Sequence, residues 1–268
     1  MEEMIVQGNT AIVAQKTITE DLFNSFIEYL DASPKTVETY TRAVRQFFKY
    51  IYENGINQPT REDVIAYREY LKDTHKPTTV QNYIVSVRIF FQWTEQKGLY
   101  PNVAEHIKGA KLDKNHKKDY LTSRQVKKVL ETAKEESLQG LRDYAILALM
   151  FTGGLRTIEV SRANIEDLRT AGDCEVLYLQ GKGHEEKTDY IKLIPEIEDA
   201  IRAYLKARGS VDPTEPLFTS TSNNSKGERI STRTVSGIVK TALKNAGYDS
   251  DKLTAHSTRH TAVTLALM

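Results

Sequence analysis

The chain has 268 residues, of which 40% are apolar and 27% charged, a composition typical of a folded protein of about two domains. Its single cysteine, Cys174, excludes a disulfide scaffold or a multi-cysteine zinc site, and no run of 18 apolar residues could span a membrane. The net charge of +1 by itself argues for no acidic partner. Because a single cysteine cannot form a disulfide within the chain and residues 1–16 lack the order of a secretory signal, we expect a cytoplasmic protein.

Helical periodicity organises residues 17–105, whereas residues 1–16 show no pattern and are expected to form a flexible arm. Apolar residues recur every three or four positions over 22–30, 37–51 and 80–91. Ser33-Pro34 predicts the start of one helix, and Thr60 with Asp63 predicts another through a capping box. Residues 17–105 are therefore predicted to form a bundle of four or five helices.

A basic segment, residues 106–120, follows this bundle and is predicted to be a linker. Residues 106–128 hold 8 Lys and Arg against 2 Asp and Glu (+6). The flanking parts are slightly acidic, with 11 against 14 (−3) in residues 1–105 and 18 against 20 (−2) in residues 129–268. Such a segment is either a solvated linker or a strap on a phosphate backbone, and the charges alone leave both interpretations open.

The remaining residues, 121–268, are predicted to combine helices with a small sheet. Residues 141–151 are apolar on nearly all sides, which indicates a buried central helix. Two strand-like runs, 175–179 and 189–193, flank a polar turn, and helices are expected over 195–208, 232–246 and from Ala255 onward. The predicted fold class is mostly α (α+β), a helical bundle followed by an α+β domain with a small antiparallel sheet.

Three positions in this second domain could carry phosphate chemistry. Arg156 follows a Gly-Gly pair at the end of the apolar helix, and Glu159 lies one helical turn later. A guanidinium there could bind a phosphate through both of its arms, or the pair could be purely structural.

The other two positions are a histidine–arginine pair and a lysine. His256 and Arg259 lie three residues apart and share one helix face, while His260 is predicted to be a packing histidine. Lys182 lies between two glycines in the polar turn, where it could reach a ligand or simply be solvated; His184 is a weaker candidate. Each of these signals is modest alone.

Their order along the chain resembles that of the tyrosine recombinase (phage integrase) family, including Xer-type resolvases and integrases of conjugative transposons. The matching residues are 152–159, 181–183 and 256–260, and the stretch from Ser33 to Phe47 is similar to the family's core-binding domain. The resemblance covers roughly residues 17–268. It implies a helical, SAM-like core-binding domain and a catalytic domain that close around duplex DNA.

By this resemblance, the reaction cleaves one DNA strand through a tyrosine and needs no metal and no cofactor. Arg156 and Arg259 would hold the non-bridging phosphate oxygens, Lys182 would protonate the leaving 5′-oxygen, and His256 would act as an acid–base partner. Glu159 would support Arg156, and His260 would have a structural role. Dimers that assemble into a tetramer on DNA are expected.

Two features depart from the family pattern. Thr258 replaces an apolar residue before the second arginine, which is a minor change. The family places a further His or Trp and then its nucleophilic tyrosine after the His-x-x-Arg helix, whereas all 14 tyrosines of this chain precede His256. We therefore expect a truncated form that binds duplex DNA but does not cleave it.

DNA-contacting residues are predicted on the polar faces of two helices and in the basic segment. Those on the helices are Lys35, Thr36, Thr39, Arg42, Arg45, Thr78, Thr79, Asn82 and Arg88. Those in the segment are Lys108, Lys111, Lys114, Lys117 and Lys118, which would contact phosphates without reading sequence.

Other functions compatible with these residues are a DNA-binding regulator that keeps the recombinase fold, a metal-free phosphodiesterase that uses His256, and a topoisomerase-like nicking enzyme.

Overall fold

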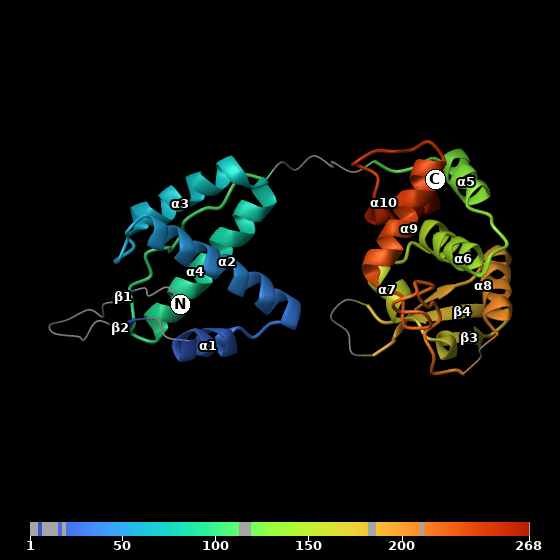
Figure 1. Ribbon diagram of the computed structural model, residues 1–268, viewed down its shortest axis with the longest axis horizontal. Coiled ribbons are helices and arrows are strands. Elements are labelled where there is room, and N and C mark those ends of the chain that lie inside the picture. The colour runs from blue at the N-terminus through green and yellow to red at the C-terminus, as the bar shows by residue number, and fades with distance from the viewer. Residues whose placement is uncertain are drawn as a thin grey trace. The chain divides into compact units, whose positions relative to one another are not determined.

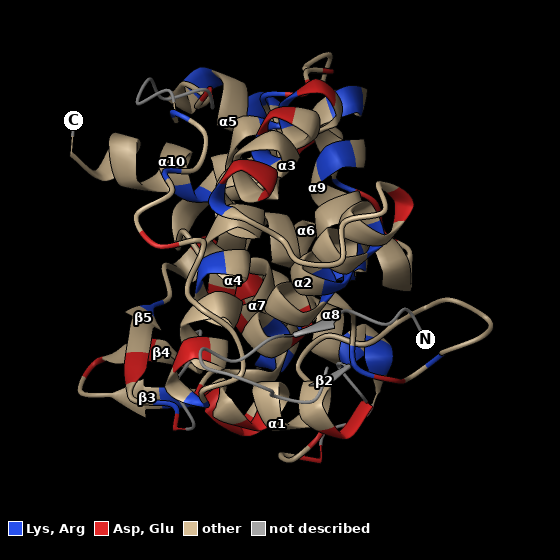
Figure 2. Ribbon diagram, turned by 90° about the vertical axis from the view of Figure 1, so that its left-hand side faces the viewer, with Lys and Arg blue, Asp and Glu red and all other residues tan. Residues whose placement is uncertain are grey.

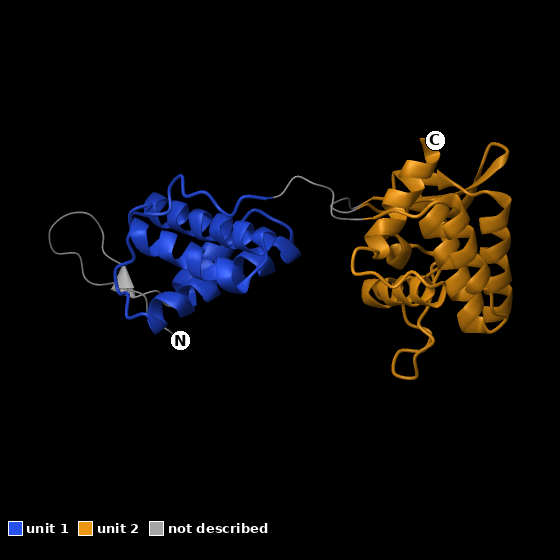
Figure 3. Ribbon diagram, turned by 90° about the horizontal axis from the view of Figure 1, so that it is seen from above, with its two compact units in different colours: residues 1–114 blue, residues 115–268 orange. Residues whose placement is uncertain are grey.

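The computed structural model describes residues 5–6, 16–17, 20–112, 119–181, 186–209 and 212–267. The chain divides into two compact units, residues 1–114 and 115–268, shown in different colours in Figure 3. The domain limits expected from the sequence remain a prediction. None of the described helices combines the length and the apolar content that a membrane crossing needs.

The first unit is a four-helix bundle. Its helices are α1 (Glu20–Tyr29), α2 (Pro34–Glu53), α3 (Arg61–Thr74) and α4 (Pro77–Gln96). The Oγ of Ser33 accepts the backbone N–H of Thr36 at the start of α2, and Thr60 and Asp63 form the capping box of α3. Both helix starts therefore agree with those predicted from the sequence.

Aromatic side chains fill the core of this unit. Phe26, Phe47 and Phe90 are fully buried, and Phe26 meets Phe90 edge to face with ring centroids 5.2 Å apart. Phe47 meets Phe91 in the same geometry at 5.8 Å. Such edge contacts add to the free energy that burial of the rings contributes. The sequence predicted this core, because these rings lie on the apolar stripes of α1, α2 and α4.

Two short strands accompany the bundle. Strand β1 (Ile5–Val6) pairs antiparallel with β2 (Lys16–Thr17), with Ile5 opposite Thr17. The sequence predicted no regular structure over residues 1–16, because a two-residue strand is too short to leave an alternating pattern.

The beginning of the predicted linker lies against the first unit. Ile107 is buried in the aromatic core. Arg61 donates through Nη1 to the Glu105 carbonyl (2.5 Å), and Arg68 donates through Nη1 to the Lys108 carbonyl (3.0 Å). Two arginines of α3 thus hold the backbone where the basic segment begins.

The second unit combines helices with a sheet (Figure 1), and its described residues form seven helical segments. The helical segments are α5 (Ser123–Thr132), α6 (Leu138–Thr152), α7 (Thr157–Arg162), the 3₁₀ turn η1 (Ile165–Asp167), α8 (Pro195–Arg208), α9 (Thr232–Asn245) and α10 (Ala255–Ala266). The sheet has the antiparallel order β3 (Leu168–Ala171), β4 (Cys174–Leu179), β5 (Asp189–Lys192). The mostly α, α+β fold class is confirmed.

Helix α6 is the centre of this unit. Residues 145–151 are all buried, and α6 packs against α5, α8, α9 and α10. An element enclosed on all sides loses the apolar–polar alternation of a surface helix, which is why this stretch is apolar throughout. The helix thereby supports α10 on one side and ends at the turn that carries Arg156.

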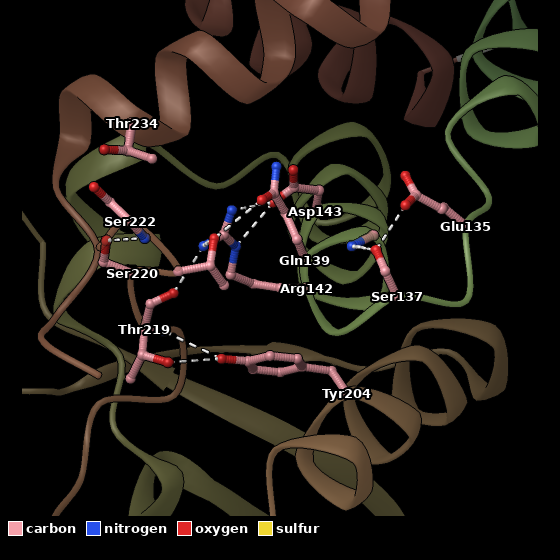
Figure 4. Close-up of polar contacts among 12 residues, drawn as sticks. Glu135, Ser137, Gln139, Arg142, Asp143, Tyr204, Thr219, Ser220, Ser222 and Thr234 are labelled. Carbon is pink, nitrogen blue, oxygen red and sulfur yellow. Dashed lines mark hydrogen bonds and ion pairs between the residues drawn. The ribbon is translucent and has the colours of Figure 1, made fainter. Parts of the chain in front are cut away.

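A polar network anchors the N-terminal end of α6 (Figure 4). Arg142, which is 3% exposed, donates to the Thr219 carbonyl (3.0 Å) and to the Thr221 hydroxyl (3.1 Å), and its Nε donates to Asp143 Oδ1 (2.8 Å). Burial raises the pKa of the Asp143 carboxyl, while the Arg142 charge opposes that rise. The hydroxyls of Tyr204 and Thr219 are hydrogen-bonded at 3.1 Å, which connects α8 to the same network.

Candidate functional site

A tight turn between α6 and α7 positions the first arginine. Gly153 caps α6, and Gly154 has φ +65°, a left-handed conformation that strains any residue with a Cβ. A Cβ at Gly154 would lie 3.2 Å from Cβ of Ala262 on α10, so the glycine also allows that helix to approach closely. Leu155 is buried and anchors the turn, and Arg156 follows as the N-cap of α7.

Replacing Gly154 by alanine is expected to destabilise the protein more than the same change at Gly172. Both glycines have φ near +65°, so both variants lose about 1–2 kcal/mol to backbone strain. Only Gly154 faces another side chain, since nothing lies within 4 Å of a Cβ at Gly172. Urea unfolding should show an additional loss of about 1 kcal/mol for Gly154→Ala. Equal losses would contradict the close approach of α10.

Glu159 orients Arg156. Its Oε1 accepts Nη1 of Arg156 (2.6 Å), and its Oε2 accepts the Arg156 backbone N–H (2.7 Å). The Glu159 side chain is 5% exposed, whereas that of Arg156 is 46% exposed. A buried carboxylate thus holds one arm of the guanidinium from behind, and nearly half of the arginine side chain stays accessible to a ligand.

Helix α10 positions the second arginine. Arg259 donates through Nη1 to the carbonyl of Gly154 (2.9 Å), in the turn that carries Arg156. The helix is anchored through buried Thr261, whose hydroxyl accepts the backbone N–H of Leu121 (3.0 Å). A single turn, preceded by a buried helix, therefore determines where both arginines lie, although they are separated by more than 100 residues in sequence.

A cleft of about 470 Å³ lies where these elements meet. It is lined by Leu155, Arg156, Thr157, Ile158, Ser236, Lys240, Thr254, Ala255, His256 and Arg259. The structure thus brings together Arg156, His256 and Arg259, three of the four residues predicted to be catalytic. His260 is not part of this lining; its ring lies edge-on to that of His256, with centroids 5.0 Å apart. A cleft with two guanidinium groups and an imidazole suits an anionic, phosphate-like ligand.

Lys182, the fourth of these residues, lies outside the described residues, as does His184. The described residue before it is Gly181, whose carbonyl accepts Nη1 of Arg162 (3.3 Å), at the C-terminal end of α7. Further along the chain, Lys187 forms an ion pair with Asp167 of η1 at 2.5 Å. The connection between β4 and β5 is thus tied at both ends to the segment that begins with Arg156.

The predicted DNA-contacting residues of the first unit lie on exposed or half-buried parts of α2 and α4. Glu38 lies between Lys35 and Arg42 and binds both, at 2.6 and 2.7 Å. Arg45 lies over the ring of Phe23 at 5.3 Å. The remaining residues on the two helices are Thr36, Thr39, Thr78, Thr79, Asn82 and Arg88. Helix α1, by contrast, is acidic (Figure 2).

Lys108 and Lys111 are exposed at the end of the first unit, whereas Lys114, Lys117 and Lys118 lie outside the described residues. Among the residues that the structure describes, no three His, Cys, Asp or Glu side chains lie close enough together to hold a metal ion. The sequence did not point to Ser236 and Lys240, which line the cleft from α9.

Comparisons with known proteins agree with this arrangement. Residues 119–266 match the phage integrase family, and residues 21–101 match the phage integrase N-terminal SAM-like domain. The chain is 31% identical to the tyrosine recombinase XerC of Pelobacter propionicus over 238 residues, which cover 87% of this chain and 76% of that protein. It is 28% identical to XerA of Pyrococcus horikoshii, over 93% of this chain and 81% of that protein.

Solved structures share the fold at lower identity. The XerH site-specific recombinase bound to its difH substrate has a TM-score of 0.70 at 17% identity, and the match covers 92% of this chain and 74% of that one. A lambda integrase dimer bound to a core site has a TM-score of 0.65 at 16% identity, over 91% of this chain and 87% of that one. The chain therefore belongs to the phage integrase family of tyrosine recombinases.

Proposed function

We propose that this protein is a site-specific DNA recombinase whose cleft binds the scissile phosphate. The observation that carries the proposal is the meeting of Arg156 and Arg259 beside His256 in one cleft. Two guanidinium groups can each donate to a non-bridging oxygen and neutralise the charge that develops in the transition state. The pair of arginines is held by protein contacts in advance, so little reorganisation is needed when a phosphate enters.

The proposed step is a transesterification. A tyrosine oxygen attacks phosphorus and forms a 3′-phosphotyrosyl bond, while the bond from phosphorus to the 5′-oxygen breaks. The tyrosine hydroxyl loses its proton as it attacks, for which we propose His256 as acceptor, and the leaving 5′-oxygen takes a proton, for which we propose Lys182 as donor. Glu159 orients Arg156, and His260 supports His256 through their ring contact. No metal or nucleotide cofactor takes part in this step.

We further propose that none of the tyrosines of residues 1–268 is the nucleophile. Among the described residues that line the cleft there is no tyrosine. Tyr204 of α8, for example, is fully buried, and its hydroxyl is hydrogen-bonded to the hydroxyl of Thr219. Residues 1–268 alone would then bind duplex DNA without cleaving it. A regulator that keeps the fold would behave in the same way. The two differ in whether a form of the protein that contains a nucleophilic tyrosine cleaves the duplex.

The DNA-binding surface we propose consists of the polar faces of α2 and α4 and the lysines of the basic segment, residues 106–120. By analogy with lambda integrase, which has been solved as a dimer and as a tetramer on DNA, we propose that copies of this protein assemble on their DNA site. We place this activity in the cytoplasm, where bacterial DNA is found.

DNA binding by residues 1–268 is expected to weaken steeply with salt. For contacts to 6–10 phosphates, affinity should fall by about 10³–10⁵ between 50 and 200 mM salt. The probe is a duplex selected by repeated binding from a random-sequence library, and binding is measured by fluorescence anisotropy. Lys111→Gln should lower the slope of log affinity against log salt by about 1, whereas the matched change at Lys206 on α8 should not. Salt-independent binding would contradict the proposed surface.

A further inference from the structure

Helix α9 supplies a third cation to the wall of the cleft. Lys240 and Ser236 lie one turn apart on α9, and both line the cleft with Arg156 and Arg259. The other side of the helix carries Val235, Val239, Ala242 and Leu243, which are buried in the core of the unit. Core packing therefore determines which face of α9 is turned to the cleft, and the short side chain of Ser236 leaves room beside Lys240.

The charge of the cleft lining is unbalanced. Its residues include Arg156, Lys240 and Arg259 but no aspartate or glutamate among those described. The carboxylate nearest in sequence to Arg156, Glu159, is buried behind it. A single phosphate held by the two arginines would leave Lys240 paired with Asp249, which does not line the cleft.

The present partners of Lys240 are replaceable. Its Nζ donates to the Ser250 carbonyl (2.9 Å) and lies 3.1 Å from Asp249 Oδ1. The Lys240 and Asp249 side chains are 41% and 56% exposed, and an ion pair this exposed contributes little to stability. A phosphate that enters the cleft could take the place of Asp249 at small cost.

We propose that Lys240 binds a second phosphate of the DNA backbone, adjacent to the one held by Arg156 and Arg259, and exchanges Asp249 for it. This inference rests on the proposed function, since it requires DNA in the cleft. The ligand is a phosphodiester, which the ammonium recognises as a point charge without reading the base sequence. Asp249 then acts as a competing anion that holds Lys240 in place while the cleft is empty.

The alternative is a purely structural role, in which Lys240 connects α9 to the loop before α10 through its contacts with Ser250 and Asp249. The two roles predict opposite effects of Asp249→Asn. If Asp249 competes with phosphate, its neutralisation releases Lys240 and keeps or strengthens DNA binding. If the pair is only a tie, Asp249→Asn and Lys240→Gln break the same contact and weaken binding alike.

The experiment measures binding of the selected duplex by residues 1–268 as a function of salt. Lys240→Gln should lower the salt slope by about 0.9, which corresponds to about a fivefold loss of affinity at 0.15 M salt. Lys240→Arg should retain the slope, Asp249→Asn should bind at least as tightly as the parent chain, and Lys206→Gln serves as the matched charge control. Urea unfolding of each variant verifies that it is folded.

The outcomes separate the two proposals. An unchanged slope for a folded Lys240→Gln, or equal weakening by Lys240→Gln and Asp249→Asn, would overturn the role of Lys240 while DNA binding itself stands. Failure of the parent chain to bind any duplex would overturn the proposed function and this inference together.

Discussion

Arg156→Ala is expected to lower DNA cleavage by a cleavage-competent form of the protein by about 10²–10³-fold, because it removes one donor to the developing phosphate charge. Duplex binding should change little, since most of the binding energy comes from phosphate contacts outside the cleft. Glu159 would lose its ion-pair partner but would keep the Arg156 backbone N–H as a donor. Adduct formation on a nicked duplex, measured under single-turnover conditions, reports the loss.

Arg169→Ala is the matched control for this prediction. Arg169 lies on strand β3, with its guanidinium over the ring of Tyr178 at 4.6 Å, and it does not line the cleft. Cleavage by that variant should stay within about twofold of the parent. If Arg156→Ala instead unfolded the protein, the pair with Glu159 would be structural and the phosphate role of Arg156 would lose its support.

Arg142→Ala is expected to have the largest effect on stability, a loss of about 3–5 kcal/mol. The buried guanidinium compensates the Asp143 carboxyl and donates to the Thr219 carbonyl and the Thr221 hydroxyl. Its removal leaves these acceptors without that donor and the carboxylate without its counter-charge (Figure 4). Urea unfolding followed by circular dichroism measures the change.

Arg202→Ala provides the comparison, because Arg202 also pairs with a carboxylate, Glu198, but on the exposed face of α8. A loss below about 1 kcal/mol is expected there. A double variant, Arg142→Met with Asp143→Leu, should recover part of the stability lost in Arg142→Ala, since no buried charge then remains. Similar losses for Arg142→Ala and Arg202→Ala would mean that the network does not support the N-terminal end of α6.

Local signals predicted much of the fold. Each helix cap, at Ser33 and at Thr60, depends on residues within one helical turn, and the buried helix α6 is one continuous apolar stretch. Such local patterns can be recognised in the sequence. Strand β3 was missed because only Leu168 of its four residues is even half-buried, which leaves no alternation to detect. The beginning of the predicted linker, residues 106–120, packs against the first unit through one buried residue, Ile107, and a single apolar residue forms no pattern that the sequence could reveal.

The cleft likewise contains one contact that the sequence predicts locally and one that it does not. The contact between Arg156 and Glu159 follows from their helical spacing, but the meeting of Arg156 with Arg259 depends on packing between α6 and α10, which local periodicity does not encode. Family resemblance supplied that pairing. The sequence did not predict that Lys240 lines the cleft, because a lysine on an amphipathic helix is ordinarily exposed to solvent.

Covalent capture on a nicked suicide duplex of the selected sequence tests the central claim most directly. A form of the protein that contains the nucleophilic tyrosine should form a 3′-phosphotyrosyl adduct that survives denaturing electrophoresis, and residues 1–268 should bind the same duplex without forming it. An adduct with residues 1–268, mapped to one of their 14 tyrosines, would contradict the assignment of the cleft. Binding by both proteins with an adduct from neither would contradict the recombinase function and favour a regulator.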